Sequence, residues 1–231
     1  MALDPAPAES ATTARVPATG ARALALAGLA GVALAVVLVG ALHVIEAETV
    51  DPIRRTISQY ALGPYKTVFD AGLLALAAGS ALILAALARA AVVRVPSTAA
   101  AFLGLWAVSL VVVVAFEKID WSVGPTLAGY IHRYASLVAF LSLPAAALLI
   151  GRHWRGHEVW GRFAAWSRGL GTLSLLWFAP ILLGFVLRPL TGVPWWQFVP
   201  LGFTERGLAL SEVAAVVVLG WWAVRASGRA G

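Results

Sequence analysis

Residues 23–45 read ALALAGLAGVALAVVLVGALHVI and contain no Asp, Glu, Lys or Arg. A helix that crosses a bilayer needs about 20 mostly apolar residues, because the hydrocarbon core is about 30 Å thick and each residue rises 1.5 Å. The stretch meets that requirement. It is also longer than the apolar part of a secretory signal peptide, which is about 7–15 residues, so it indicates an uncleaved signal anchor.

Five further stretches extend this pattern along the chain. Four of them lack Asp, Glu, Lys and Arg, and the last contains only Glu212; they are 71–88, 95–116, 134–151, 169–187 and 207–224. With flanking residues, they and the first stretch predict spans at about 23–45, 65–88, 96–116, 126–151, 168–187 and 205–224. The sequence therefore predicts an all-α, polytopic membrane protein with a six-transmembrane-helix bundle. We expect one membrane domain over 23–225, a flexible tail over 1–22 and a short tail over 226–231.

The overall composition supports this class. Of the 231 residues, 61% are hydrophobic and 12% are charged, whereas soluble domains have about 45–50% apolar and about 25% charged residues. The chain has no Cys, which excludes disulfides, thiolate catalysis and metal sites with Cys ligands.

The charges predict the orientation. One set of connections and both tails hold ten basic and three acidic residues, and the opposite connections hold seven basic and eight acidic residues. By the positive-inside rule both termini should be cytoplasmic. The net charge of +6 then reflects orientation and contact with anionic membrane lipids, and we expect no nucleic-acid partner. Abundant Ala and an excess of Arg over Lys are typical of high-GC bacteria, so we expect a bacterial plasma membrane.

The three outer connections carry mixed polar residues. In the first, Asp51 and Pro52 predict the start of a short interfacial helix that ends at Gly63 and Pro64. This helix is either an amphipathic cap with Arg54 and Arg55 at lipid phosphates, or a wall of a binding site with Asp51, Arg55 and Tyr60 turned inward. We expect Lys118, in the second connection, to be interfacial as well.

In the second connection, Pro125 and Thr126 mark the start of the fourth span, with His132 about two turns inside it. Asp120 and Glu117 are the nearest carboxylates that could hold His132. The cluster is either structural or a catalytic, proton-handling pair.

In the third connection, Trp195, Trp196 and Phe198 are typical of an interfacial aromatic belt. Thr204 is the expected N-cap of the sixth span. Glu212 lies two turns, or about 10 Å, below Glu205, so it should face the bundle or a wet cavity.

These groups define the candidate site, an outward-opening polar pocket. His43, in the last turn of the first span, and Glu117 belong to its expected ring. The catalytic candidates are Asp120, His132 and Glu212. The expected ligand-binding residues are Asp51, Arg55, Tyr60, Asp70, Asp120, His132, Arg133, Glu205, Arg206 and Glu212. These outer segments hold no His-x-x-x-His pair and no repeated Glu-x-x-His, so we expect no metal, and we expect no cofactor.

Four stretches resemble a bacterial membrane family known as domain of unknown function 998. They are DPIRRTISQYALGPY (Asp51–Tyr65), Phe116-x-x-x-Asp120, GYIHRYASLVAF (Gly129–Phe140) and GFTERGLAL (Gly202–Leu210). The family pattern has Pro after the Phe of the second stretch, where this chain has Glu117. The resemblance implies the six-span fold and a shared outer face, and it implies no reaction.

Three functions follow as alternatives. The leading hypothesis is a pocket for a lipid-like or amphiphilic small molecule. The second is a membrane-embedded enzyme that acts on an isoprenoid or lipid by Asp, Glu and His acid–base chemistry. The third is a structural or regulatory subunit that packs on a partner through small residues such as Gly28, Gly31 and Gly40. Neither enzymatic activity nor oligomeric state follows from the sequence.

Overall fold

The computed structural model describes residues 18–192 and 194–229, and the regular elements of these residues are all helices. They are α1 (Ala18–Ile45), the 3-10 helix η1 (Ile57–Leu62), α2 (Lys66–Arg89), α3 (Thr98–Ala115), α4 (Leu127–His153), α5 (Gly161–Leu176), α6 (Ala179–Thr191), α7 (Trp195–Phe198) and α8 (Leu201–Ser227). Six segments are long and apolar enough to cross a membrane. The predicted all-α, six-span class is confirmed.

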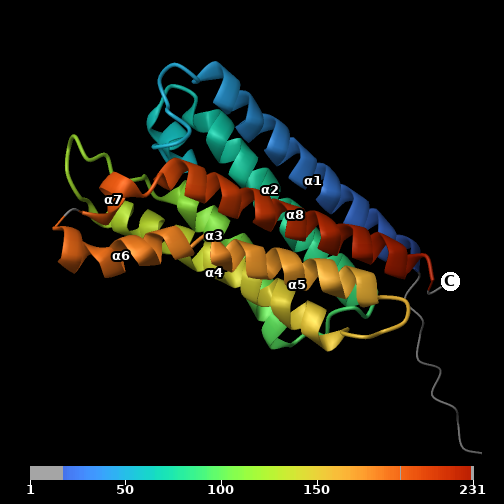
Figure 1. Ribbon diagram of the computed structural model, residues 1–231. Coiled ribbons are helices and arrows are strands. Elements are labelled where there is room, and N and C mark those ends of the chain that lie inside the picture. Colours follow the sequence, from blue (N-terminus) through green and yellow to red (C-terminus); the bar gives the residue numbers. More distant parts are fainter. Residues whose placement is uncertain (1–17, 193, 230–231) are drawn as a thin grey trace, which may run out of the picture.

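The helices form a bundle with α8 at its centre (Figure 1). Helix α8 packs against α1, α2, α4 and α5, while α1 packs on α2 and α3 packs on α4. The start of α1 and the end of α8 lie together, which we call the terminal end (Figure 1). The opposite, loop end holds the three longer connections, 46–64, 116–126 and 194–200. Which end faces the cytoplasm stays a prediction.

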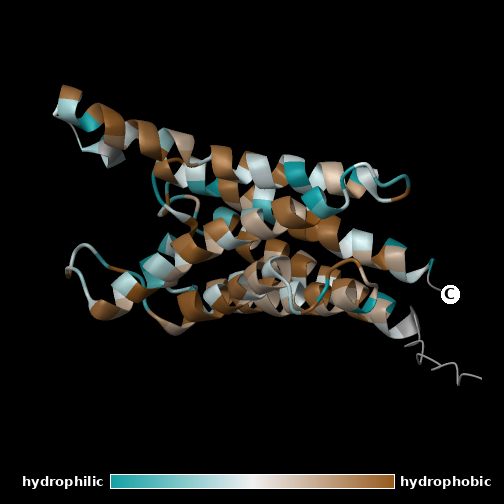
Figure 2. Cartoon of the chain, turned by 90° about the horizontal axis from the view of Figure 1, so that it is seen from below, coloured by the Kyte–Doolittle hydropathy of each residue, from teal (hydrophilic) through white to brown (hydrophobic). Residues whose placement is uncertain are grey.

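Hydrophobic residues cover much of the helix surfaces in Figure 2. The exposed apolar side chains include Val37, Leu182, Val186 and Leu210, each more than 60% exposed. Such exposure is costly in water and natural in lipid, because the bilayer takes the place of an apolar core. The surface therefore agrees with the spans.

Close packing of α1 on α2 depends on glycine. A Cβ on Gly28 would lie 2.7 Å from the carbonyl oxygen of Gly79, and a Cβ on Gly79 would lie 2.6 Å from that of Gly28. Gly31 also lies against Ala75 and Gly79. Two of the glycines that we considered for contact with a partner therefore serve packing within the chain.

The fifth span consists of two helices. Helix α5 ends at Leu176, and α6 starts at Ala179 with Pro180 in its first turn. Proline fits a first turn because it has no N–H to donate there. The fifth span is therefore not one continuous helix, because the helix stops at Leu176 and restarts at Ala179. Pro144, in contrast, lies inside continuous α4.

The starts of two helices decide where the site residues lie. Helix α4 begins where predicted, with Thr126 as its N-cap, and the Thr126 hydroxyl accepts from the Gly129 amide at 3.0 Å. Helix α8, however, begins at Leu201, so the expected N-cap role of Thr204 is wrong. The extra turn puts Glu205 and Arg206 inside the helix, facing the neighbouring segments.

The predicted boundaries of the tails differ from the helix limits. Helix α1 already begins at Ala18, within the expected tail, and residues 1–17 of that tail lie outside the described residues. At the other terminus, α8 continues to Ser227, and residues 230–231 are likewise outside the described residues.

Candidate functional site

Arg206, in the second turn of α8, joins α8 to α1 and to the first connection. Its Nη1 donates to the carbonyl oxygens of Pro52 at 2.8 Å and Arg55 at 2.6 Å, and its Nε donates to Nε2 of His43 at 2.8 Å. Nδ1 of His43 donates to the Val39 carbonyl at 2.8 Å. Because a carbonyl can only accept, this bond leaves Nε2 as the acceptor for Arg206. One guanidinium thus fastens three segments.

Gly202 allows the first connection to approach α8 closely. A Cβ at this position would lie 2.3 Å from the carbonyl oxygen of Arg55 and 2.6 Å from that of Pro52. The Phe203 amide donates to the Ile53 carbonyl at 3.0 Å. The backbone of the connection therefore lies directly on the first turn of α8.

Glu205, the neighbour of Arg206, faces η1. The backbone amides of Ile57 and Ser58, at the start of η1, donate to its carboxylate, and Lys118 and Arg206 attract it electrostatically. These amides have no partner within the first turn of the helix, so a carboxylate satisfies them. Glu205 therefore holds the start of η1.

Lys118 completes this group from the connection between α3 and α4. Its Nζ donates to Oγ1 of Thr56 at 2.8 Å and to Oε1 of Gln59 at 3.0 Å. Burial lowers its pKa from 10.5 to about 8, although the attraction of Glu205 opposes the decrease. Lys118 therefore faces η1, and its expected place at the membrane interface stays a prediction. We call the set His43, Thr56, Ser58, Lys118, Glu205 and Arg206 the polar junction.

A cavity of about 430 Å³ lies beside the polar junction. Small-molecule sites typically measure about 300–1,000 Å³. Its lining is mostly apolar and comes from α1, η1, α2, α3, α4 and α8. The polar side chains that line it, apart from Trp106, are His43, Ser58, Ser136, Glu205, Arg206 and Glu212.

Glu212 is the most buried ionisable group of this cavity. It is 0% exposed, and neither carboxylate oxygen has a hydrogen-bond partner among the described residues. Seven residues separate it from Glu205, which is two turns on the same face of α8. The cavity thus has a polar junction at one level and a single carboxyl group about 10 Å deeper.

The cavity opens between α1 and α8. Val36 of α1 and Leu210 of α8 line it, yet they are 51% and 70% exposed. Gly40 also lines it and is exposed, and a Cβ there would meet no atom within 4 Å. Toward the terminal end, Gly220 of α8 lies against Leu29 of α1 and closes the gap. An apolar chain could therefore enter from the side.

A family model described as "Protein of unknown function (DUF998)" matches residues 29–222. The chain belongs to this family. No curated protein and no solved structure matches it. The match confirms the resemblance seen in the sequence. In this DUF998 protein, two of the quoted stretches, Asp51–Tyr65 and Gly202–Leu210, meet at Gly202 and Arg206.

Three expected ligand residues of the first connection have other contacts. Asp51 is exposed, and its Oδ1 accepts from the Ile53 amide at 2.8 Å, so it caps a turn. The expected helix start at Asp51 is wrong, because the helix begins at Ile57; its end at Gly63 is as predicted. Arg55 contributes its carbonyl to the polar junction. Tyr60 is buried and does not line the cavity; its ring centroid lies 5.2 Å from that of His43, and its hydroxyl accepts from Nη2 of Arg206 at 3.4 Å.

Asp70 and Arg133 also lie away from the cavity. Asp70 forms an ion pair with Lys66, one turn earlier in α2. Arg133 is exposed on α4 and forms no hydrogen bond or ion pair with another residue of 18–192 or 194–229. The structure therefore brings together Glu205, Arg206 and Glu212 from the expected ligand set and His43 from the expected ring.

Asp120 and His132 do not join Glu212. The Ser122 hydroxyl and amide donate to Asp120 at 2.7 and 2.9 Å, which lowers its pKa below the usual range. Nδ1 of His132 donates to the carbonyls of Val113 and Phe116, each at 2.9 Å. The expected carboxylate partner of His132 is therefore wrong. Free carbonyls at the end of α3 take that role, because a helix end leaves them without intrahelical donors.

Sequence reasoning missed Ser58 and Ser136 as well as the inward position of Lys118. Ser58 lies at the start of η1, and the hydroxyl of Ser136 donates to the His132 carbonyl at 2.9 Å. Lysine in a short loop gives no local sign of burial. Among the described residues, no group of three or more His, Asp or Glu is arranged to hold a metal ion.

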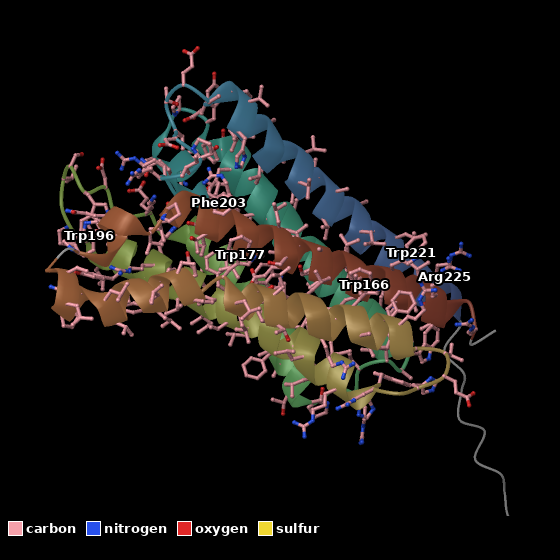
Figure 3. All side chains as sticks on the ribbon, in the orientation of Figure 1. Trp166, Trp177, Trp196, Phe203, Trp221 and Arg225 are labelled. Carbon is pink, nitrogen blue, oxygen red and sulfur yellow. The ribbon has the colours of Figure 1, made fainter. Side chains whose placement is uncertain are left out.

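The aromatic belt is only partly visible. Trp196 is exposed at the loop end (Figure 3), while the side chains of Trp195 and Phe198 lie outside the described ones. Trp177, which follows α5, faces Phe203 of α8, and their ring centroids lie 5.6 Å apart (Figure 3).

Proposed function

We propose that this DUF998 membrane protein binds an amphiphilic molecule in the cavity between α1 and α8. The apolar chain of the ligand lies among the aliphatic and aromatic side chains of the cavity. A hydroxyl or amine of the ligand donates to Glu212. The proposal concerns binding, and no reaction is part of it.

The observation that carries the proposal is the carboxyl group of Glu212. Buried polar atoms are almost always hydrogen-bonded, and a buried group without a partner costs about 1–3 kcal/mol or more. Both oxygens of Glu212 lack a partner among the described residues, and the side chain lines a cavity. A ligand that carries a donor would satisfy this group, whereas a plain hydrocarbon would not.

The shape of the cavity supports an elongated, mostly apolar ligand. Val36, Gly40 and Leu210 leave an opening toward the side of the bundle, where lipid tails lie in a membrane. A molecule already dissolved in the bilayer would enter without crossing water. The polar junction covers the loop end of the cavity and can contact a second polar group of the ligand.

The geometry gives less support to the other two functions. Acid–base chemistry by Asp120, His132 and Glu212 requires a common site, and Glu212 alone of the three lines the cavity. A partner subunit was expected to use Gly28, Gly31 and Gly40. Gly28 and Gly31 lie against α2 instead, and Gly40 lines the cavity.

Photo-crosslinking tests the proposal on the full-length protein in lipid nanodiscs. The probes are a long-chain alcohol with a diazirine in its chain and the matching hydrocarbon without the hydroxyl. We expect the alcohol to label peptides that contain residues 36–43 and 206–213, and to label them more strongly than the hydrocarbon does. The Glu212→Met variant should remove the difference between the two probes.

Gly40→Leu should block labelling, because the new side chain fills the opening. Gly169→Leu is the matched control: Gly169 is an exposed helical glycine on α5, and a Cβ there also meets no atom within 4 Å. Equal labelling by alcohol and hydrocarbon in the wild-type protein would refute the role of Glu212. Labelling that Gly40→Leu leaves unchanged would refute the cavity as the site.

We also propose that the protein lies in a bacterial plasma membrane with its loop end outside, as the arginine distribution indicates. The chain has no Cys, so single cysteines can be introduced at Ser122 and Gly156. A membrane-impermeant maleimide added to intact cells should label the first and spare the second. The reverse pattern would overturn this orientation.

A further inference from the structure

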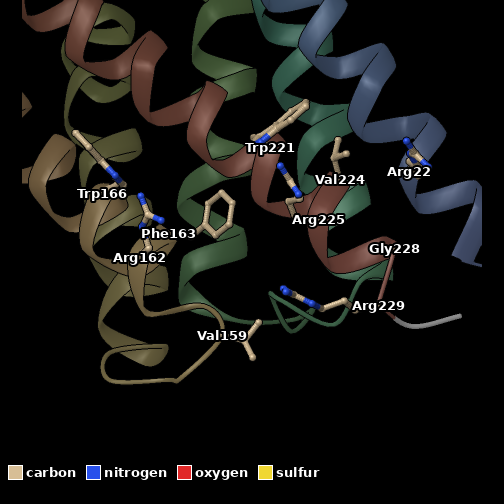
Figure 4. Close-up of a pocket in the computed structure, with 10 residues that line it drawn as sticks. All are labelled: Arg22, Val159, Arg162, Phe163, Trp166, Trp221, Val224, Arg225, Gly228 and Arg229. Carbon is tan, nitrogen blue, oxygen red and sulfur yellow. The ribbon is translucent and has the colours of Figure 1, made fainter.

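A second hollow lies at the terminal end, far along α8 from the cavity. It measures about 860 Å³ and is lined by residues of α1, α5, α8 and the loop before α5. Arg162 and Trp166 of α5 stand on one side, Arg22 of α1 stands on the other, and Arg225 of α8 and Arg229, just after the end of α8, lie between them (Figure 4). We call this hollow the arginine groove.

The charge of the arginine groove has one sign. Four of its ten lining residues are arginines, and none is acidic. All four arginines are exposed, and none of them forms an ion pair with a described residue. Glu158 precedes the lining residue Val159, but it is not part of the lining. Because arginine stays charged at any physiological pH, the groove is strongly attractive to an anion.

Aromatic rings position two of these guanidinium groups. Arg225 lies over the ring of Trp221 at 5.6 Å, and Arg229 lies over that of Trp160 at 4.9 Å. A guanidinium stacked on a ring keeps its N–H groups at the edge, where they can donate in pairs to phosphate oxygens. Stacking also limits the motion of the side chains, which lowers the entropy lost on binding.

The apolar walls of the groove indicate a lipid as the source of the phosphate. Trp166 and Trp221 are 59% and 44% exposed and lie beside Arg225 near the end of the bundle (Figure 3). Tryptophan concentrates at the level of lipid head groups. One turn deeper on α8, exposed Val217 continues the apolar surface toward the middle of the span.

We infer that the arginine groove binds an anionic phospholipid, with its phosphate between Arg162, Arg225 and Arg229 and an acyl chain along α8 between α1 and α5. The groove is separate from the cavity at Glu212, and the inference does not rest on the function proposed there. The occupant is a lipid and not a free anion, because aromatic and aliphatic side chains form the rest of the lining.

Native mass spectrometry of the full-length protein tests this inference. The protein is released from nanodiscs that contain equal amounts of phosphatidylglycerol and phosphatidylcholine with identical acyl chains. We expect retained phosphatidylglycerol to exceed phosphatidylcholine. Arg162→Gln and Arg225→Gln should each weaken this retention about five-fold, the factor that corresponds to about 1 kcal/mol per basic residue near an anionic surface. Arg225→Lys should weaken the retention of phosphatidylglycerol less, because lysine keeps the positive charge.

Arg133→Gln is the matched control, since Arg133 is an exposed arginine at the loop end, outside the groove. It should retain phosphatidylglycerol as the wild type does. Equal retention of both lipids, or equal loss in all three Gln variants, would overturn the inference. Displacement of the lipid by millimolar inorganic phosphate would show a free-anion site and would also overturn it.

Discussion

Replacing Arg206 by Met should detach the first connection from α8 without unfolding the bundle. The change removes the donations to the carbonyls of Pro52 and Arg55 and to His43, together with a longer one to the Tyr60 hydroxyl. Methionine keeps most of the aliphatic stem of the side chain. The structure therefore predicts a local effect on residues 46–64.

The expected size follows from the three shorter bonds, because the bond to Tyr60 is 3.4 Å long and weak. A hydrogen bond to a charged group contributes about 1.5–3 kcal/mol when it is protected from water. The two carbonyls are exposed to solvent, so water can replace the guanidinium there, and about 1 kcal/mol each is a more suitable value. With His43, the total is about 3 kcal/mol, which corresponds to a change of about 100-fold in the opening equilibrium.

Hydrogen exchange measured by mass spectrometry reports this opening directly. The amides of Val50, Arg55 and Gln59 donate within the connection, and they should exchange about 100-fold faster in Arg206→Met. Peptides of α4 and α5 should not change. Arg133→Met, at an exposed arginine of the same end, is the control and should behave as the wild type. Unchanged exchange over 46–64, or faster exchange everywhere, would refute the reasoning.

Three further predictions concern single residues of the same region. Gly202→Ala should also speed hydrogen exchange over 46–64 and lower the free energy of unfolding by about 1–3 kcal/mol, because its Cβ would clash with two carbonyls. Gly169→Ala is the control and should not destabilise the protein, because a Cβ at Gly169 meets no atom within 4 Å. Glu212→Met should raise the apparent melting temperature in detergent, because it removes a buried carboxyl group without a partner; a lower value would contradict this, with exposed Glu117→Met as the control. Lys118 should titrate near pH 8 in NMR spectra of isotopically dimethylated protein, with Lys66→Arg used to assign the two lysine signals. Between about pH 8 and 10.5 the unfolded chain holds a proton on Lys118 that the folded protein has lost, so the free energy of unfolding should rise with pH over this range. The rise should be smaller in Lys118→Met. A titration midpoint above about 10 would contradict the burial of Lys118.

Predictions from local sequence succeeded where the cause is local. The cap at Thr126 depends on a hydroxyl three residues before an amide, and the end of η1 depends on Gly63. The break between Leu176 and Ala179 was not predicted, because the apolar run of residues 169–187 continues through it. The mean hydropathy of a span depends only on its residues, so it does not show whether one helix or two helices form the span.

Only some of the residues of the candidate site could be predicted from the sequence. Glu212 could be placed inside the bundle, because the depth of a charge along a helix follows from counting residues. The partners of His132 could not be predicted, since they are carbonyls at the end of another helix. Glu205 and Arg206 are adjacent in sequence but about 100° apart around α8. Glu205 therefore meets the start of η1, whereas Arg206 meets the turn before η1, His43 and Tyr60.

The sequence by itself determined that this DUF998 chain is a helical membrane protein with six spans. The reason is that apolar length and charge are properties of each segment alone. The tertiary structure decided which polar groups meet. It turned Lys118 inward, separated Asp120 and His132 from Glu212, and opened a cavity between α1 and α8. These outcomes depend on the rotation and spacing of packed helices, which glycines such as Gly28, Gly79 and Gly202 set by close backbone contact.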